Sequence, residues 1–489
     1  MWWKIILILL ALFIIVTLIR AIFYKPKKIE GVKIEDADID ENKVAEHLSR
    51  AIQCKTISRS NPDEIDWSEF DKFHDFLDEA YPLIKQNTTK EKVSKASLIY
   101  RWKGKNPELE PMALLSHQDV VPVAEGTEND WTHDAFSGYN DGEIIWGRGA
   151  LDMKNHLICV MEAVESLMEE GFQPERDVYL CFGHNEEIVC SKESGADEIV
   201  KVLQSRGIHL DSVLDEGSAL LRLDLKGLIH TYIAAVGVAE KGYADMKLTV
   251  HDKGGHTSAA PKHSGMAKLA NMVQDIEKHQ FKSHMLPFLT ELFDTVGRKA
   301  TYLGRVVMCN VPLLKPIIKL VLKTIPESAS MVRTIQSISM CEGSPEPNVL
   351  PQRPNITVNF RPLPGDTVDD VEKHIRKAVR YKDLEVERLY SKEATAFSST
   401  DSRAFNAIKK VEEGLHPNDV AVAPYLVMGG TDSYRYGKIC DNILRYAPFN
   451  VSVALFLTTH ATDERCPISA LKESVIFFRE YIKEVSKKD

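Results

Sequence analysis

The stretch "DVYLCFGHNEE", Asp177 to Glu187, joins an apolar run to two adjacent glutamates. The run from Val178 to Phe182 is apolar throughout, as in a strand that is buried on both faces of a parallel sheet. Glu186 and Glu187 follow directly after the turn. Neighbouring carboxylates repel each other, so a pair of them where a strand leaves a core indicates chemistry at that end of the strand.

Strand and helix patterns alternate on both sides of this stretch. The apolar run at 112–117 predicts a second strand, and residues 211–217 predict a third that runs into Asp215. Residues 156–171 carry their apolar side chains on one helical face and end at a glycine, and residues 195–207 predict a second helix. This alternation predicts an α/β fold with a mostly parallel central sheet and helices on both faces.

The pattern changes near residue 240. Residues 243–258 alternate between apolar and polar side chains, and residues 354–365 form a strand pattern that ends in a Pro/Gly turn. An amphipathic helix pattern follows at 368–379. The predicted domain boundaries are therefore 240–390 for a separate α+β domain, inserted into a main domain of 43–239 and 391–489.

The chain begins with an apolar segment, residues 1–24, in which Lys4 and Arg20 are the only charges. Its length suffices to cross a bilayer core of about 30 Å. No small-residue cleavage site follows it, which favours a membrane anchor over a cleaved signal peptide. The charged stretch 25–42 is interpreted as a linker.

The side of the membrane on which the body lies is left open by the sequence. Lysines directly after the apolar segment favour a cytosolic body. Glycosylation sequons at Asn87, Asn355 and Asn450 favour a lumenal or extracellular glycoprotein, or a secreted one if the segment is cleaved. We expect a lumenal or extracellular body.

Composition excludes one class of partner. The net charge is −10 with a pI near 5.9, and no basic stripe is visible, which argues against nucleic acid. The eight cysteines are scattered, with no metal-binding spacing and no evident disulfide framework.

Polar residues gather at the predicted strand ends. In an open parallel sheet the carboxyl ends of the strands line one crevice, so residues far apart in sequence meet there. Mixed imidazoles and carboxylates suit zinc or a similar divalent ion. These candidates are His117, Asp119, Asp152, Glu186, Glu187, Asp215 and His460, the last at the end of a late apolar run.

The candidate ligands outnumber those that one tetrahedral ion accepts. Two ions about 3.5–4 Å apart, bridged by a carboxylate and a water, would use them all. Two cations would also remove the repulsion between Glu186 and Glu187. One glutamate could then bind metal while the other takes a proton from the bridging water.

The motifs "SHQDVVPV", "WGRGALDMKN", "GHNEE", "LDEG", "GGHTSAAP", "NFRPLPGDT", "GGTDSYRY" and "THATDE" occur in this order. Over roughly residues 45–485 the chain thereby resembles the aminoacylase/carboxypeptidase family of di-zinc metallopeptidases. The resemblance is closest to the branch that holds vacuolar carboxypeptidase S and the N-fatty-acyl-amino-acid synthase/hydrolase.

The resemblance implies a role for each polar residue in the crevice. It places His117, Asp152 and Asp215 on one zinc ion, and Glu187, His460 and the shared Asp152 on the other, with a water or hydroxide between the ions. Glu186 would be the general base. The Asp119 carboxylate would orient His117 by accepting its second ring N–H.

The resemblance also implies roles outside the crevice. His256 of the inserted domain would polarise the scissile carbonyl, reaching in from the partner subunit in dimeric members. A homodimer through this lid or dimerisation domain is therefore expected. Arg361 would bind a substrate carboxylate with its guanidinium fork. The remaining substrate-binding candidates are Asn348, Gly430 and Thr431.

The expected activity is zinc-dependent cleavage, or formation, of the amide bond of an N-fatty-acyl amino acid. The alternatives are a carboxypeptidase acting on short peptides and a catalytically silent, membrane-anchored binding protein. Residues 284–340 are unusually apolar for a lid. We interpret them as extra core, with an acyl-chain channel that includes Leu313, Leu314 and Ile317, or membrane contact, as the functional alternatives.

Overall fold

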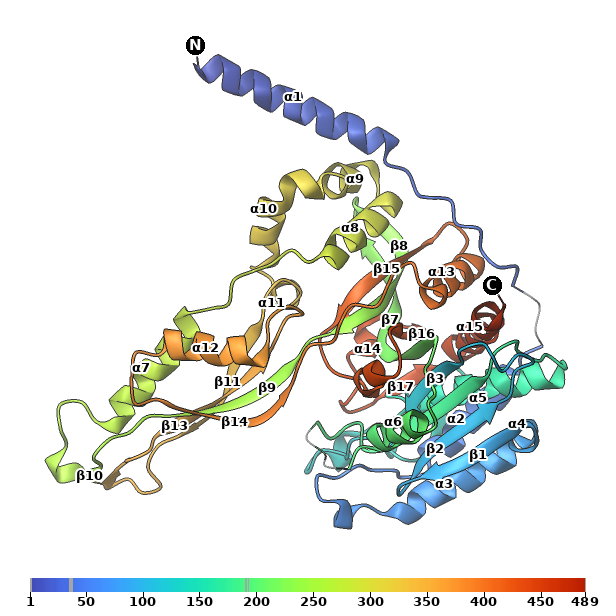
Figure 1. Ribbon diagram of the computed structural model, residues 1–489, viewed down its shortest axis with the longest axis horizontal. Helices are drawn as coiled ribbons and strands as arrows, with labels where there is room; N and C mark the ends of the chain where they lie inside the picture. Colours follow the sequence, from blue (N-terminus) through green and yellow to red (C-terminus); the bar gives the residue numbers. More distant parts are fainter. Residues whose placement is uncertain (1, 35–37, 190, 192, 489) are drawn as a thin grey trace.

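The computed structural model describes residues 2–34, 38–189, 191 and 193–488. A body built on a large sheet carries an elongated arm, and an N-terminal helix, α1 (Trp2–Phe23), projects from it (Figure 1). The arm points away from the body, and its tip lies far from α1. The predicted α/β architecture with an inserted α+β unit is confirmed.

The body is organised around an eight-stranded sheet. Its pairs β6–β3, β3–β7, β7–β16 and β8–β15 are parallel, whereas β1–β2, β2–β6 and β7–β8 are antiparallel. In spatial order the strands are β1 (Thr88–Val93), β2 (Ser97–Trp102), β6 (Val178–Gly183), β3 (Met112–His117), β7 (Ser212–Leu225), β16 (Ile443–Asn450), β8 (Ile229–Glu240) and β15 (Val420–Val427).

Helices cover both faces of this sheet. Leu114 and Leu214 pack into one core cluster and their neighbours Leu115 and Val213 into another, as strand alternation requires. The first face is covered by α2 (Glu41–Ile52), α3 (Trp67–Ala80), α4 (Pro82–Asn87), α5 (Lys154–Glu169), α13 (Arg403–Leu415) and α15 (Ile468–Ser486), and the second by α6 (Gly195–Ser205) and the 3-10 helix η4 (Asp432–Lys438).

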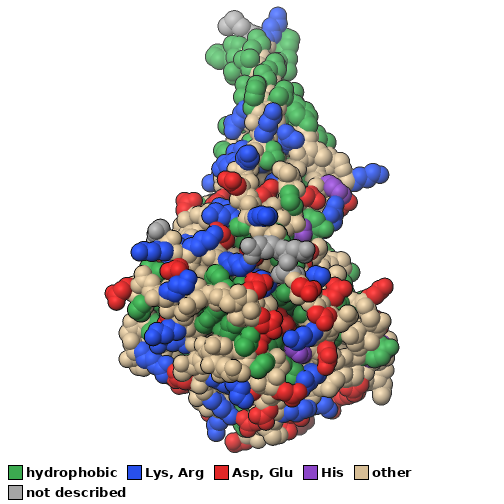
Figure 2. Space-filling model, turned by 90° about the vertical axis from the view of Figure 1, so that its right-hand side faces the viewer, with side chains coloured by type: hydrophobic (Ala, Val, Ile, Leu, Met, Phe, Trp, Pro, Cys, Tyr) green, Lys and Arg blue, Asp and Glu red, His purple; other side chains and the backbone are tan. Residues whose placement is uncertain are grey.

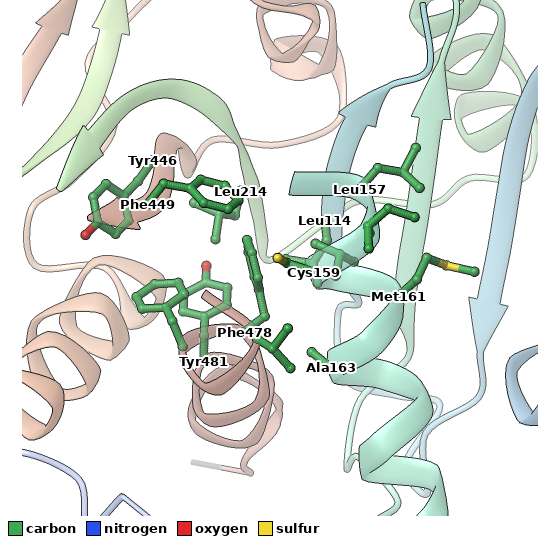
Figure 3. Close-up of a cluster of buried hydrophobic side chains, with 14 of the residues drawn as sticks. Leu114, Leu157, Cys159, Met161, Ala163, Leu214, Tyr446, Phe449, Phe478 and Tyr481 are labelled. Carbon is green, nitrogen blue, oxygen red and sulfur yellow. The ribbon is translucent and has the colours of Figure 1, made fainter. Parts of the chain in front are cut away.

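The core on the first face holds α5 in place. Phe478 of α15 lies beside Cys159 of α5, and Tyr481 lies on the side of Tyr446 and Phe449 of β16 (Figure 3). Each such side chain contributes roughly 1.5–3 kcal/mol when fully buried. Because Asp152 lies directly before α5, this packing also fixes one side of the crevice at the strand ends.

The arm is a separate α+β unit with its own core. Its four strands pair antiparallel, and alternate strand residues such as Met246 and Val358 pack with Ile375 of the covering helix in a core of their own. Its elements are β11 (Ile335–Glu342), β13 (Asn355–Arg361), β9 (Tyr243–Thr249), β14 (Glu385–Lys392), α7 (Gly265–Lys278) and α12 (Val368–Ala378), with β10 (Gly255–His256), η3 (Thr257–Ala259) and β12 (Val349–Leu350) at the tip.

One part of the predicted insertion packs on the body. Val296 and Ala300, at the end of α8, contact Ala421 and Ala423 of β15, so residues 287–299 cover the central sheet and not the arm. The connecting helices are α8 (Pro287–Lys299), α9 (Tyr302–Met308), α10 (Val311–Leu322) and α11 (Pro326–Ser330).

The other short elements lie in the loops of the body. Three strands form a small antiparallel sheet beside the crevice. These elements are β4 (Tyr139–Asn140), β5 (Ile144–Trp146), β17 (Arg465–Pro467), η1 (Pro62–Glu64), η2 (Glu128–Asp130) and α14 (Val453–Phe456).

Glu412 of α13 gives a pH-dependent test of the core. It is buried and accepts a hydrogen bond of 2.7 Å from the Tyr446 hydroxyl, and burial raises its pKa to about 7. A raised carboxyl pKa lowers stability as pH rises from about 4.5 towards 7, because the native state then holds a proton that the unfolded chain has lost. The free energy of unfolding of Glu412→Gln, relative to that of wild type, should therefore increase by about 2–3 kcal/mol between pH 5 and pH 8.

The measurement is the thermal unfolding midpoint of both proteins across this pH range. The exposed Glu387→Gln is the control and should follow wild type. A constant difference between Glu412→Gln and wild type would contradict a raised pKa.

Candidate active site and metal centre

Three parallel strands deliver the polar residues of the site to one edge of the sheet. His117 ends β3 and pairs with Gly183, the last residue of β6. Glu186 and Glu187 follow in the loop after β6, and β7 runs alongside β3 on its other side. The carboxyl ends of β3 and β6 therefore meet at one crevice, which β7 passes on the other side of β3.

The glutamate pair is held by Asp119 beneath it. Asn185 adopts a left-handed φ of 59°, which turns the chain sharply after β6. The buried Asp119 carboxylate accepts the backbone N–H groups of Glu186 and Glu187, both at 3.2 Å. These two bonds aim both glutamate side chains into the crevice.

The predicted role of the Asp119 side chain needs correction. His117 Nδ1 donates to the backbone carbonyl of Asp119 at 2.8 Å, whereas the nearer carboxylate oxygen lies 3.7 Å away. The ring is thus oriented with Nε2 towards the site, but by the main chain. The Asp119 carboxylate is already engaged by the two glutamate N–H groups.

The loop that carries Asp152 is fixed by a residue that the sequence reasoning missed. The buried Glu464 carboxylate accepts backbone N–H groups of Gly149, Leu151 and Asp152 at 2.8–3.1 Å. Arg148 bonds Glu464 and, at 3.2 Å, the backbone carbonyl of His460. Glu464 and Arg148 thereby join the Asp152 loop to the His460 loop. Glu464 is the last residue of the "THATDE" motif, and this position is the sequence signal that could have identified it.

His460 reaches the site from an element that the sequence did not predict. It does not end a strand: it follows the short helix α14 and has a left-handed φ of 61°. Ser452 caps α14 by accepting the backbone N–H of Leu455, which turns this apolar run into a helix.

Asp152 lies between two histidines. His117 Nε2 is 3.0 Å from Asp152 Oδ1, and His460 Nε2 is 3.1 Å from Oδ2. Glu216 lies 3.4 Å from His117 Nε2, and Glu187 lies 3.0 Å from His460 Nε2. Two three-residue groups that share Asp152 therefore have the composition of metal sites.

The spacing of these atoms fits divalent metal ions. Zinc–nitrogen and zinc–oxygen bonds of about 2.0–2.1 Å put neighbouring tetrahedral ligand atoms about 3.3 Å apart. The four distances of 3.0–3.4 Å match that edge length. Each group also leaves room for a further ligand, as catalytic sites require.

Glu216, and not Asp215, faces His117. The prediction placed the end of a strand at Asp215, but β7 continues to Leu225. Successive strand side chains point to opposite faces, so only one of the two acids can face the crevice. Asp215 points away and accepts the backbone N–H of Ser433 at 2.9 Å. The structure therefore places Glu216, and not the predicted Asp215, where a ligand beside His117 would lie.

The carboxylates of the crevice carry more negative charge than the histidines balance. Burial, reinforced by Asp152, raises the pKa of Glu187 and of Glu216 to about 7. Burial, with Glu216 and Glu187 nearby, raises the pKa of Glu186 well above its usual range. Hydrogen bonds to Asp152 and Glu187 raise the pKa of His460 to about 10. Cations bound here would offset this negative charge and lower the pKa of each carboxyl group.

The crevice opens into a pocket of about 650 Å³ with three chemically distinct regions. The acidic region holds the two metal-ligand groups and Glu186. The basic region is lined by Lys241, Arg361 and Lys392. The apolar region is lined by Ala219, Leu221, Ala235, Tyr425, Ala447 and Phe449.

The apolar region is the uncovered continuation of a sheet face. Leu223, Ile233 and Ala423 pack against the α8 layer. The pocket-lining residues Leu221, Ala235 and Tyr425 lie two positions further along the same strands, and so on the same face. The predicted acyl channel of Leu313, Leu314 and Ile317 is not what lines this pocket.

The predicted substrate-binding residues fall into two groups. Arg361, Gly430 and Thr431 line the pocket. Arg361 stacks over the Tyr243 ring at 4.5 Å and donates to Asn359, and among the described residues no carboxylate pairs with it. His256 and Asn348 lie together at the exposed tip of the arm, away from the pocket of their own chain.

Comparison with known proteins agrees with this geometry. Residues 113–484 match the model of peptidase family M20/M25/M40. The chain belongs to this family. It is 34% identical over 471 residues to a probable carboxypeptidase S-like 2 of Dictyostelium discoideum, covering 95% of this chain and 90% of that one.

A second relative is named for a different activity. The N-fatty-acyl-amino acid synthase/hydrolase PM20D1 of Mus musculus is 29% identical over 453 residues, covering 91% and 88% of the two chains. An M20 metallo-carboxypeptidase of Sulfolobus solfataricus has the same fold, with a TM-score of 0.63, 17% identity and coverage of 92% and 99%. This M20 protein is therefore a hydrolase of amide bonds, in a metal-dependent family.

The position of Glu216 beside His117 can be tested by comparing zinc binding in variants of Glu216 and of its neighbour Asp215. Glu216→Gln removes a ligand charge beside His117 and should weaken zinc binding at least about tenfold. Asp215→Asn keeps an acceptor for the Ser433 N–H and should bind zinc as wild type does. Competition with a chromogenic chelator measures both affinities. A larger loss in Asp215→Asn than in Glu216→Gln would return the ligand role to Asp215.

Proposed function

We propose that this protein cleaves, and in reverse forms, the amide bond of N-fatty-acyl amino acids. Such a substrate has an amide, a carboxylate and an alkyl chain. The pocket offers an acidic, a basic and an apolar region to match them. The apolar region carries the proposal, because a dipeptide would leave it unfilled.

The proposed cofactors are two zinc ions. His117, Asp152 and Glu216 would hold one, and Asp152, Glu187 and His460 the other. When bound, such ions polarise a carbonyl and lower the pKa of a bound water towards about 7. The donor set of imidazoles and carboxylates suits zinc.

Glu186 is the proposed general base. It lines the pocket beside both ligand groups and is not a member of either. It takes a proton from the attacking water as the water oxygen bonds to the amide carbon. It then gives that proton to the nitrogen as the carbon–nitrogen bond breaks, releasing a fatty acid and an amino acid.

Arg361 is the proposed carboxylate-binding residue. Its stacking on Tyr243 fixes the guanidinium plane, and its free donors suit a bidentate carboxylate. Lys241 lies in the same basic region and adds positive charge. Gly430 and Thr431 border this region, where the Thr431 hydroxyl donates to Glu240.

His256 is proposed to act on a second copy of the chain. It cannot reach the pocket of its own chain from the arm tip, and the resemblance places this histidine on the scissile carbonyl of a partner. Asn348, whose backbone carbonyl accepts the Thr257 N–H, would accompany it. A homodimer through the arm follows from this proposal.

Helix α1 is the proposed membrane anchor. It is long and apolar enough to span a bilayer, with a mean hydropathy of 3.1, and equally fits a signal peptide. The proposed location of the body is lumenal or extracellular, or secreted after cleavage. Of the three sequons, Asn355 is buried in β13 and donates to Glu342, so it is a poor acceptor for a glycan.

A carboxypeptidase is the second candidate. The relative from Dictyostelium discoideum is named for that activity. The basic region would serve the carboxylate of a peptide C-terminus as well as that of an acyl amino acid. The two candidates differ only in what fills the apolar region.

The apolar region can be tested by narrowing it. Ala235→Phe and Ala447→Phe should lower kcat/KM for N-oleoyl-phenylalanine at least about tenfold and leave N-acetyl-phenylalanine within about twofold, because only the long chain meets the new ring. Glycyl-phenylalanine is measured beside them. Equal losses on all three substrates, or fastest wild-type cleavage of the dipeptide, would favour the carboxypeptidase.

The general base has its own test. Glu186→Gln keeps the shape of the side chain but removes its basicity, so kcat should fall about 10²–10⁴-fold. Zinc content measured by mass spectrometry should stay at the wild-type value. Chelation should abolish wild-type activity, and added zinc should restore it. Activity of Glu186→Gln near wild type would assign the base to another group.

A further inference from the structure

The last turns of α1 are docked on the α8–α9 corner of the body. The Tyr302 hydroxyl donates to the backbone carbonyl of Leu18 at 3.1 Å, and Arg20 donates to that of Cys309 at 3.1 Å. Thr17 and Ala21 of α1 are buried in this contact, whereas the rest of the helix is exposed. Tyr24 continues the contact by donating to Asp294 of α8.

This contact fixes the position of α9 and α10 along the axis of α1. A helix of 22 residues is about 33 Å long, close to a bilayer core of about 30 Å. Thr17 lies about 9 Å before the end of α1. Elements that touch α1 there would therefore sit at the boundary between headgroups and acyl chains if α1 spans a membrane.

Helix α10, which follows α9 at this position, exposes an apolar stripe. Leu313, Ile317, Leu320 and Val321 are 48–63% exposed and recur at helical spacing on one face. The side towards the body includes Leu322, which packs against the main core. The stripe is thus not a misplaced core face, since α10 has a separate buried side.

Within the sequence segment that carries the stripe, residues 301–325, every charge is positive. Residues 301–325 contain no acidic residue, whereas Lys315, Lys319 and Lys323 lie on the flank of α10. The linker after α1 adds further lysines. In Figure 2 Lys and Arg side chains gather below the apolar column at the top of the molecule. Such a combination suits a helix lying in the surface of an anionic bilayer.

We propose that α9 and α10 form a second membrane-contact surface, which lies in the headgroup region beside α1 and prefers anionic lipid. A lipid surface fits better than a second copy of the chain, because α9, which precedes the stripe, contacts the apolar helix α1 and every charge within residues 301–325 is positive. This surface also adjoins the active site: α11 follows α10, and Ser330 contacts Met428, which lines the pocket.

The experiment uses the full chain reconstituted in vesicles, with one environment-sensitive fluorophore attached to a single introduced cysteine. The background carries Cys341→Ser, which removes an exposed thiol, and Cys190→Ser, outside the described residues. The labelled positions are Leu9→Cys in α1, Ile317→Cys on the stripe, and Leu389→Cys, an exposed apolar control on the arm. Lipids with a nitroxide on the acyl chain serve as quencher.

We expect at least twofold quenching at positions 9 and 317 and none at 389. Quenching at 317 should fall when phosphatidylserine is omitted, or when Lys315, Lys319 and Lys323 are changed to Glu, while position 9 stays quenched. An unquenched label at 317 in vesicles where position 9 is quenched would overturn the proposal, as would the absence of quenching at both. Because the readout needs no turnover, it is independent of the proposed substrate.

Discussion

The arrangement of the site depends on the sharing of Asp152 between two histidines in a crevice crowded with carboxylates. Its oxygens lie 3.0 and 3.1 Å from His117 and His460, and Glu187 and Glu216 complete the two groups. Such a concentration of negative charge is unfavourable at the end of a buried sheet unless cations or protons compensate it. The surrounding protein is organised to hold the groups together despite their repulsion.

Two further carboxylates provide that support, and neither faces the proposed metals. Asp119 accepts the backbone N–H groups of Glu186 and Glu187, and Glu464 accepts those of the Asp152 loop. Each accepts hydrogen bonds from fixed main-chain N–H groups, and Arg148 adds a positive charge beside Glu464. The ligand loops are therefore held by the main chain, and their side chains remain free to bind.

The sequence predicted much of this because strand ends are readable from apolar runs. His117 ends such a run, the glutamate pair follows another, and Asp152 lies just before a predicted helix, so their meeting could be inferred from the order of elements in a parallel α/β sheet. The choice between Asp215 and Glu216 could not, because it depends on β7 continuing through both residues and on which face each side chain takes. The role of the Asp119 carboxylate likewise depends on a turn whose backbone donors leave no mark in the sequence.

The same limit explains why residues 284–340 were interpreted in three ways. Their composition is equally compatible with core, channel and membrane contact, and the structure divides these roles among different surfaces. Val296 packs as core on β15, strands of the body line the apolar pocket, and the α10 stripe stays exposed beside α1. The arm tip with His256 lies far from α1, α9 and α10 (Figure 1). The proposed pairing through the arm and the proposed bilayer contact through α10 therefore use separate surfaces, so the two proposals are compatible with each other in one molecule.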